Sequence, residues 1–356
     1  SMYANVGATY TSGGITYVTG GEAVRPGGHP ITVTFTNGQA GVAQLRTVSR
    51  TAQSVTAVIP AGQYSTSTDS ASGGVFFVPL SAGTTTVTAS APGVTAVNAS
   101  QVVTVSAPAL AFNRAPQYVG AGLRYGYFYV QLGAPAPAGG LDITVKTSSA
   151  STLLVAPETG QAATVGSATT TLHVDARSSN GFLDVDGVEN ASGTVTITAS
   201  APGYTNATTS ISVTPVGAAL GGLPSSLATS ASPSAIYASV GPVYTSGGVT
   251  YFGGAQTVRP GGHPITLAFT NSQSSVGQLS TSAGTGQRET AVVAIGEQNT
   301  PTDVTSGGVA FQPLGAGTTT VNVGGSGIAA NAQSSQAVTV SATAPSVARA
   351  SARAPR

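Results

Sequence analysis

Three of the 11 acidic residues of this 356-residue chain form its one acidic cluster along the sequence, Asp184, Asp186 and Glu189 in the segment Leu-Asp-Val-Asp-Gly-Val-Glu-Asn at 183–190. Carboxylates that alternate along a chain and are followed by glycine can supply oxygen ligands to Ca²⁺, which takes about six to eight of them. A solvated strand and turn would use the same residues, and the segment lacks most of the ligands of a calcium site. We expect no cofactor, with calcium as the alternative that these carboxylates leave open.

Aromatic residues alternate in the segment Leu-Arg-Tyr-Gly-Tyr-Phe-Tyr-Val at 123–130. Successive side chains of a strand point to opposite faces, so Tyr125, Tyr127 and Tyr129 are predicted to share the face opposite Phe128. If Phe128 faces the core, the three tyrosines form an exposed stripe. Flat rings that carry a hydroxyl suit sugar stacking or a protein interface. We favour packing of this stripe against a neighbouring unit or strand, because edge strands need covering.

Histidine is the residue type that most often serves as a general base, and His29 and His263 both lie in Gly-Gly-His-Pro segments. A catalytic histidine needs an acid that orients it and a nucleophile within hydrogen-bond reach. Glu22 precedes the first histidine, whereas Gln256 takes the same place before the second. One triad cannot be built in both places, so we expect surface turns and no enzyme.

These residues belong to a chain that contains one segment twice. Val-Arg-Pro-Gly-Gly-His-Pro-Ile-Thr begins at Val24 and again at Val258, which gives an offset of 258 − 24 = 234 residues. A more distant copy lies between them, because Thr-Ala-Ser-Ala-Pro-Gly at 88–93 returns at 198–203, an offset of 198 − 88 = 110 residues. The order of units is A-B-A, which is typical of a repeat array that spans distance and presents surfaces.

Composition and periodicity favour an all-β fold. Only 6% of the residues are charged, and Thr, Val, Ser, Ala and Gly dominate. Ile31, Val33 and Phe35 alternate with threonines, which predicts a half-exposed strand over 31–36, and the same alternation recurs over 54–59 and 83–90. About seven such strands per unit predict antiparallel two-sheet sandwiches. The net charge of +1 provides no footprint for nucleic acid, and no apolar run is long enough for membrane insertion.

The repeats and turn signals divide the chain into five segments. We predict type A repeats over 1–107 and 234–343, and a divergent type B repeat over 108–216. The segment 217–233 is rich in Gly, Ala, Ser and Pro and is predicted to be a flexible linker. Residues 344–356 carry three arginines without an apolar period and are predicted to be a disordered basic tail. Ser1 before Met2 indicates an expression remnant, so we expect a piece of a longer protein.

Three segments carry a resemblance to a known family. Ile-Thr-Val-Thr-Phe-Thr at 31–36, Ser-Val-Thr-Ala-Val-Ile-Pro-Ala-Gly-Gln at 54–63 and Gly-Thr-Thr-Thr-Val-Thr-Ala-Ser-Ala-Pro-Gly at 83–93 follow one another in an order that resembles the bacterial immunoglobulin-like repeats of large surface proteins. The resemblance implies a tandem array of three immunoglobulin-like antiparallel β-sandwich domains. It also implies stalks, spacers or self-associating layers, with adhesive or glycan-binding roles in some members and calcium between modules in others.

Two functional hypotheses follow. The first is a non-catalytic structural module of a bacterial extracellular or cell-surface protein, such as a stalk, a surface layer or a self-assembling filament. Its expected partners are copies of itself or neighbouring repeats of the same protein. The alternative is a glycan-binding adhesin module that would use the tyrosine stripe to bind carbohydrate.

Overall fold

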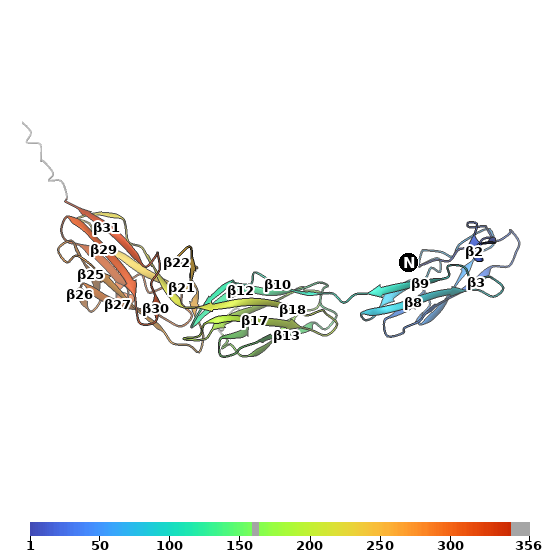
Figure 1. The fold of residues 1–356 in the computed structure, drawn as a ribbon, viewed down its shortest axis with the longest axis horizontal. Coiled ribbons are helices and arrows are strands. Elements are labelled where there is room, and N and C mark those ends of the chain that lie inside the picture. Colours follow the sequence, from blue (N-terminus) through green and yellow to red (C-terminus); the bar gives the residue numbers. More distant parts are fainter. Residues whose placement is uncertain (159–163, 343–356) are drawn as a thin grey trace, which may run out of the picture. The chain divides into compact units, whose positions relative to one another are not determined.

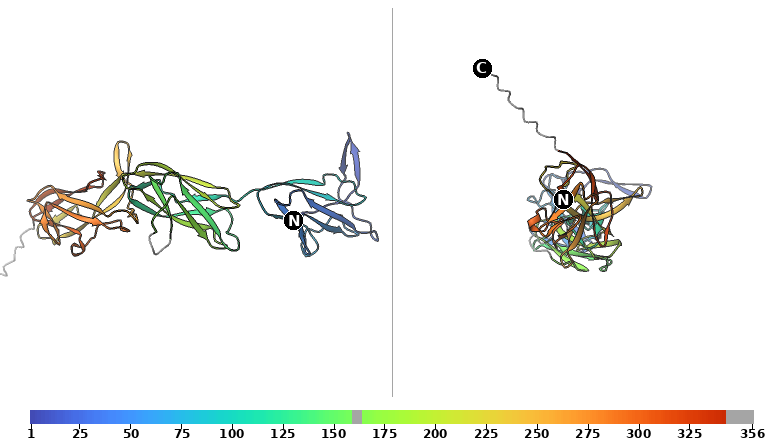
Figure 2. Two further views of the ribbon diagram at one scale, coloured as in Figure 1. Left: turned by 90° about the horizontal axis from the view of Figure 1, so that it is seen from below. Right: turned by 90° about the vertical axis from the view of Figure 1, so that its left-hand side faces the viewer.

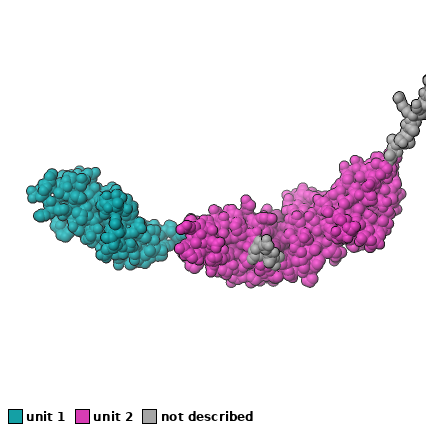
Figure 3. Space-filling view, turned by 180° about the vertical axis from the view of Figure 1, so that it is seen from behind, with its two compact units in different colours: residues 1–108 teal, residues 109–356 magenta. Residues whose placement is uncertain are grey.

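The computed structural model describes residues 1–158 and 164–342, so the predicted tail over 344–356 lies outside the described residues. The chain is nearly all β-structure and divides into two compact units, residues 1–108 and 109–356 (Figures 1 and 3). In the described part the helical content is one 3-10 turn, Val304–Ser306. No helix there is long and apolar enough to cross a membrane. The predicted all-β class is confirmed.

Unit 1 consists of two sheets and a projecting hairpin. The hairpin pairs β1 with β2, and Figure 2 shows it in blue, standing clear of the sheets. The first sheet has the order β6-β3-β8-β9 and the second has the order β5-β4-β7. The bounds are β1 Thr9–Ser12, β2 Ile15–Val18, β3 Ile31–Asn37, β4 Ala43–Arg46, β5 Thr51–Ala52, β6 Ser54–Ile59, β7 Phe76–Pro79, β8 Gly83–Ser90 and β9 Ser100–Val105.

Alternation places the core of unit 1 as the sequence predicts. Val33 and Phe35 of β3 are buried between the two sheets, and the threonines beside them face outward or sit at intermediate depth. A buried polar clasp adds specificity, because the Asn37 side-chain amide donates to the carbonyl of Ala43 and its oxygen accepts from the Thr85 hydroxyl. Asn271 and Thr319, 234 residues later, repeat this clasp. The predicted strands over 31–36, 54–59 and 83–90 are confirmed.

Unit 2 begins with a sandwich that we call the B sandwich, residues 109–214. One sheet has the order β10-β12-β16-β14 and the other has the order β11-β18-β17-β13-β15, with a single hydrophobic cluster between them. The bounds are β10 Leu110–Asn113, β11 Tyr118–Gly120, β12 Leu123–Leu132, β13 Leu141–Thr147, β14 Leu153–Pro157, β15 Thr169–Val174, β16 Asn180–Gly187, β17 Gly193–Ser200 and β18 Ala207–Thr214.

The rest of unit 2 is a second sandwich, which we call the C-terminal sandwich, residues 216–342. Its sheets have the orders β26-β25-β28-β21-β19-β30 and β20-β31-β29-β24-β27, around a hydrophobic cluster of their own. The bounds are β19 Val216–Gly221, β20 Ser226–Ala228, β21 Ser234–Ser246, β22 Val249–Phe252, β23 Thr257–Val258, β24 Ile265–Asn271, β25 Gly277–Thr281, β26 Gly284–Gly286, β27 Arg288–Val293, β28 Val309–Pro313, β29 Gly317–Gly324, β30 Ile328–Ala329 and β31 Ser335–Ser341.

Both sandwiches of unit 2 have an immunoglobulin-like strand order. In the B sandwich, β10-β12-β16-β14 corresponds to strands A-B-E-D of that fold, and β18-β17-β13 corresponds to G-F-C. The short strand β11 pairs in parallel with the last strand, β18. The C-terminal sandwich repeats this pattern with β19-β21-β28-β25 and β31-β29-β24, and β20 pairs in parallel with β31.

The predicted flexible linker over 217–233 is wrong. Strand β19 pairs along its whole length with β21, and β20 pairs with β31, so this segment supplies the first two strands of the C-terminal sandwich. Leu223 is buried in the core of that sandwich. Small residues such as Gly217 occur here because strands pack closely, since a Cβ at Gly217 would lie 2.3 Å from the side chain of Val243. Close strand packing and flexibility both favour glycine and alanine, so composition alone did not separate them.

We predict that Leu223→Ala destabilises the C-terminal sandwich by about 2–4 kcal/mol, because truncation of a buried leucine loses transfer free energy and leaves a cavity. The exposed Leu314 of the same sandwich provides the matched control, and Leu314→Ala should change stability by less than about 0.5 kcal/mol. Urea unfolding of the full chain measures both. A flexible linker at this position would give equal, small effects for the two variants.

Candidate functional site

Charged and polar side chains gather where the two sandwiches of unit 2 meet. Pro215 alone separates β18 from β19, and the short strand β23 leaves its own sandwich to pair with β12 of the B sandwich. The pairing sets Val258 opposite Leu123, and Leu123 is fully buried within the hydrophobic cluster of the C-terminal sandwich. The backbone N–H of Arg259 donates to the carbonyl of Gly122 at 3.0 Å. The two sandwiches therefore share both a sheet and a core.

Gln256 fastens the junction with both ends of its amide. Its Oε1 accepts from the backbone N–H of Gly120 at 3.0 Å, and its Nε2 donates to the carbonyl of Tyr118 at 3.0 Å. The side chain is buried, so neither backbone group of the B sandwich is left without a partner. An amide carries a donor and an acceptor on separate atoms, and Gln256 uses both of them on the backbone of β11.

Arg259 forms the ion pair of the junction with Glu189 of the B sandwich. Its Nε lies 3.0 Å from both carboxylate oxygens of Glu189, and its Nη2 donates to Oε2 as well. Burial opposes ionisation of Glu189, but these hydrogen bonds outweigh it and lower the pKa of the carboxyl below its ordinary value. A Cβ at Gly262 would lie 2.5 Å from Glu189 Oε1, so a larger residue there would displace the carboxylate from this position. The ion pair thus depends on the turn of the repeated Val-Arg-Pro-Gly-Gly-His-Pro segment.

An aromatic contact and a groove complete the junction. The ring of Tyr118 stacks on that of Tyr244, with centroids 5.3 Å apart and planes at 2°, and Tyr251 also stacks on Tyr244, with centroids 5.7 Å apart. Beside this stack, a groove of about 550 Å³ is lined by both sandwiches, and Tyr118, Tyr125, Tyr244 and Gln256 are among its residues. The hairpin of β21 and β22 is therefore held against the B sandwich by its tyrosines.

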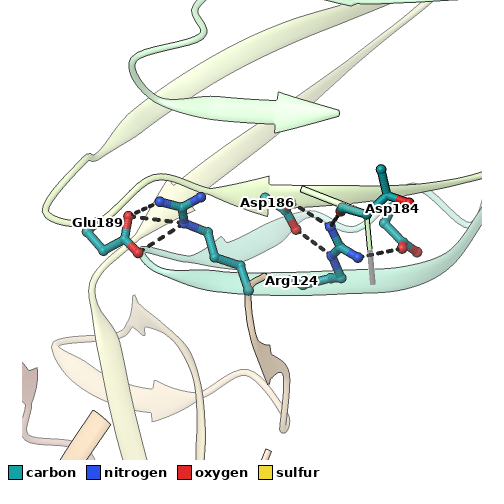
Figure 4. A network of polar contacts seen from close by, with 6 residues as sticks. Arg124, Asp184, Asp186 and Glu189 are labelled. Atoms are coloured by element: carbon teal, nitrogen blue, oxygen red, sulfur yellow. Dashed lines mark hydrogen bonds and ion pairs between the residues drawn. The ribbon is translucent and has the colours of Figure 1, made fainter. Parts of the chain in front are cut away.

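A second buried ion-pair cluster lies in the B sandwich, on the side of β12 and β16 that faces away from the hydrophobic core (Figure 4). Arg124 Nε donates to Asp186 Oδ1 at 2.6 Å, and its Nη1 lies 3.1 Å from Asp184 Oδ2. Its Nη2 also donates to the carbonyl of Thr164. Burial opposes the charge of Arg124, yet Asp186 and Asp184 keep its pKa above the ordinary value. Burial raises the pKa of Asp184 to about 6, against the opposing effect of Arg124.

The structure separates the three carboxylates that the sequence places in one cluster. Asp184 and Asp186 bind Arg124, whereas Glu189 binds Arg259 (Figure 4). Within residues 1–158 and 164–342, no group of three or more His, Asp or Glu side chains is arranged to hold a metal ion. All three carboxylates act as ion-pair partners in this geometry, and calcium binding stays a prediction from the sequence pattern.

The predicted tyrosine stripe is wrong because β12 contains a bulge. Its register with β16 shifts between Tyr125 and Phe128, and Tyr127 adopts a left-handed backbone with φ of 65°. The extra residue reverses the alternation. Tyr125 consequently packs against the core of the B sandwich, Tyr129 lies beside Phe182, and Tyr127 is 77% exposed at the bulge. The three rings do not share one face.

Sequence reasoning missed Arg124, Gln256 and Arg259, the three residues that bind carboxylates or backbone at these sites. The sequence did contain an indication for Arg259. Only 6% of the residues are charged, yet the repeated segment has an arginine in both copies, Arg25 and Arg259, which favours a specific role for this position. The histidines of the same segments, His29 and His263, are exposed in turns as expected. Contacts between residues distant in sequence, such as Gln256 with Gly120, left no pattern in the sequence.

We predict that the stability of unit 2 responds to the ionisation of Asp184. A carboxyl whose pKa rises on folding binds its proton more tightly in the folded state, so it favours folding most below its unfolded value of 3.8. This advantage is lost as the pH rises towards about 6. The free energy of unfolding of the wild type, relative to Asp184→Asn, should therefore fall between about pH 4 and pH 7. Urea titrations at unit pH steps test this, and a constant difference would contradict it.

We predict unequal effects for two neighbouring tyrosines. Tyr125→Ala should destabilise unit 2 by about 2 kcal/mol, because it removes a ring that packs on the core. Tyr127→Ala should cost less than about 0.5 kcal/mol, since that ring is exposed at the bulge. Chemical unfolding of both variants measures this. A continuous exposed stripe would instead make both changes nearly neutral.

Comparisons with known proteins give distant likenesses to solved structures. No protein-family model matches the chain, and no curated protein matches it. Among solved structures, the chain is similar to surface layer protein SbsC, domains 4–9, at 14% identity and a TM-score of 0.25, over 95% of this chain and 42% of that one. SbsC domains 5–6 match at 16% identity and a TM-score of 0.23, over 67% of this chain and 100% of that one. Escherichia coli alpha-2-macroglobulin matches at 11% identity and a TM-score of 0.22, over 92% of this chain and 30% of that one. Likenesses at these scores carry no argument about function.

Proposed function

We propose that this chain is a non-catalytic structural module of a bacterial extracellular or cell-surface protein, a component of a stalk, surface layer or filament. The junction of unit 2 is the observation that carries the proposal. The chain has few charged residues, yet it buries Arg259 and pairs it with the partly buried Glu189 where one sandwich meets the next. A module that only tethered two domains would need no such contacts.

The junction is suited to transmitting force. Leu123 enters the core of the next sandwich, β23 extends the sheet of the previous one, and Gln256 binds backbone rather than a mobile side chain. Pulling the sandwiches apart would expose a buried leucine, break a two-residue strand pairing and leave Arg259 and Glu189 unpaired. These contacts break together, so the joint resists bending more than a flexible linker would.

We further propose that the partners are neighbouring repeats or other copies of this chain. The net charge of +1 leaves little long-range repulsion, and the edge of β9 and the hairpin of β1 and β2 expose Val102, Tyr10 and Ile15. The glycan-binding alternative has less support, because the tyrosine stripe on which it depended is interrupted by the bulge in β12.

We predict that Arg259→Ala uncouples the two sandwiches of unit 2. Removal of the guanidinium leaves Glu189 partly buried without its partner, which should cost about 1–3 kcal/mol and separate one unfolding transition into two. Differential scanning calorimetry of the full chain measures this. Glu189→Gln should act in the same direction.

The chain contains its own control for this variant. Arg25 occupies the same place in the first repeat but is exposed and forms no ion pair in unit 1. Arg25→Ala should therefore change stability by less than about 0.5 kcal/mol. Equal effects of the two substitutions would show that the junction does not hold the sandwiches together, and the proposed function would fail with it.

A further inference from the structure

Unit 1 carries the same junction surface as the C-terminal sandwich, but nothing within unit 1 covers it. Val258 and Arg259 are buried against the B sandwich, whereas Val24 is half-buried and Arg25 is exposed. Three further pairs of residues related by the offset of 234 show the same difference in exposure. The covered members are Tyr244, Gln256 and Pro260, and their exposed counterparts are Tyr10, Glu22 and Pro26.

The backbone of this surface is already formed in unit 1. The Val24 N–H donates to Gln63 O at 2.9 Å and the Gly62 N–H donates to Val24 O at 2.7 Å. In the C-terminal sandwich the Val258 N–H donates to Glu297 O at 2.8 Å and the Gly296 N–H donates to Val258 O at 2.9 Å. Gly27 and Gly261 share a left-handed turn, with φ of 76° and 73°. A partner would therefore meet a preorganised surface and lose little free energy in ordering it.

The structure describes every residue of unit 1, and two of its sheet edges have no neighbouring strand. The C-terminal sandwich has a strand at each equivalent edge. There, β19 pairs with β21 and β20 pairs with β31, and Val338 and Val340 of β31 are fully buried. The strand β9 of unit 1 matches β31 but has no neighbour on that edge, and its Val103 and Val105 are only half-buried. No strand of unit 1 corresponds to β19 or β20.

We infer that this face of unit 1 is a docking surface for a B-type sandwich with its trailing strands, and that a second copy of residues 109–228 fits it. In such a complex, Glu189 of the second copy would pair with Arg25, and Tyr118 of the second copy would stack on Tyr10. Its segment equivalent to 216–228 would close both open edges. The inference deepens the proposed function and rests on it, since it names the neighbour that unit 1 accepts.

One position departs from this match and provides a test of its own. Gln256 accepts from Gly120 and donates to Tyr118 O, but Glu22 at the equivalent place has no proton to donate when ionised. The carboxylate of Glu22 would face the carbonyl of Tyr118 of the second copy with no hydrogen between the two oxygens. It could still accept a hydrogen bond from the backbone N–H of Gly120 of that copy. Glu22→Gln should therefore tighten docking, whereas the same change has no partner to act on in the chain alone.

The experiment attaches residues 109–234 directly before Ser1 of the full chain, because Ser1 occupies the place of Ala235 under the same offset. Hydrogen–deuterium exchange then follows two regions. The Arg25 amide reports docking, since its counterpart in Arg259 donates to Gly122 O. Peptides from 216–228 arise from both copies, so they give one population when both copies are paired and two when the added copy is not.

We expect exchange at the Arg25 amide to slow at least about tenfold in the extended chain, 216–228 to give one protected population, and the melting temperature of unit 1 to rise. Arg25→Ala should reverse the slowing in the extended chain and have no effect in the original one. Glu22→Gln should slow exchange further.

Fast exchange at Arg25 with two populations over 216–228 would overturn the inference. An added copy that stays unfolded would overturn it as well, because a docked unit 1 should support that copy as the C-terminal sandwich supports the original. Arg259→Ala in the extended chain separates this failure from failure of the proposed function. If it still uncouples unit 2, only the docking surface is wrong.

Discussion

The cost of burying a guanidinium governs the arrangement of unit 2. A buried arginine that lacks a carboxylate at short range is strongly destabilising, so the position of Arg259 requires Glu189 and the position of Arg124 requires Asp184 and Asp186. These ion pairs fix the relative positions of elements, which the non-directional hydrophobic effect alone would not do. Arg259 brings the turn of one sandwich onto the end of another, and Arg124 ties β12 to β16 beside the bulge. The hydrophobic contacts of Leu123 and the amide bonds of Gln256 then fit a geometry that charge pairing has restricted.

The strands of each sandwich were predictable because their information is local. Alternation of Val33 and Phe35 with threonines is enough to predict β3 and the face that it buries. The segment 217–233 failed for a physical reason, since small residues that permit β19 to approach β21 closely are the same residues that permit flexibility. The tyrosine stripe failed at one residue. The bulge at Tyr127 interrupts the alternation of β12, so Tyr125 and Phe128 both lie on the core side, and the period-2 rule has no means of locating a bulge.

The candidate site was predictable only in its inventory of residues. The sequence identifies Asp184, Asp186 and Glu189 as a cluster because they are close along the chain, yet strand direction sends the first two to Arg124 and the turn after β16 carries the third to Arg259. Proximity in sequence therefore predicted shared chemistry where the fold creates two separate ion pairs. Partners 60 to 70 residues away decide the role of each carboxylate. Such partners become visible only once the register of β12 with β16 and with β23 is known.

The two copies of Val-Arg-Pro-Gly-Gly-His-Pro separate what local sequence determines from what a neighbour determines. Both copies form the same turn with the same backbone hydrogen bonds, so the turn follows from its own residues. Only one copy buries its arginine, because only that copy has a B sandwich against it within its unit. The pKa of Glu189, the burial of Val258 and the specificity of Gln256 are therefore properties of a pair of modules. A repeat of this kind encodes its fold in each copy, whereas its interface depends on which module lies next to that copy.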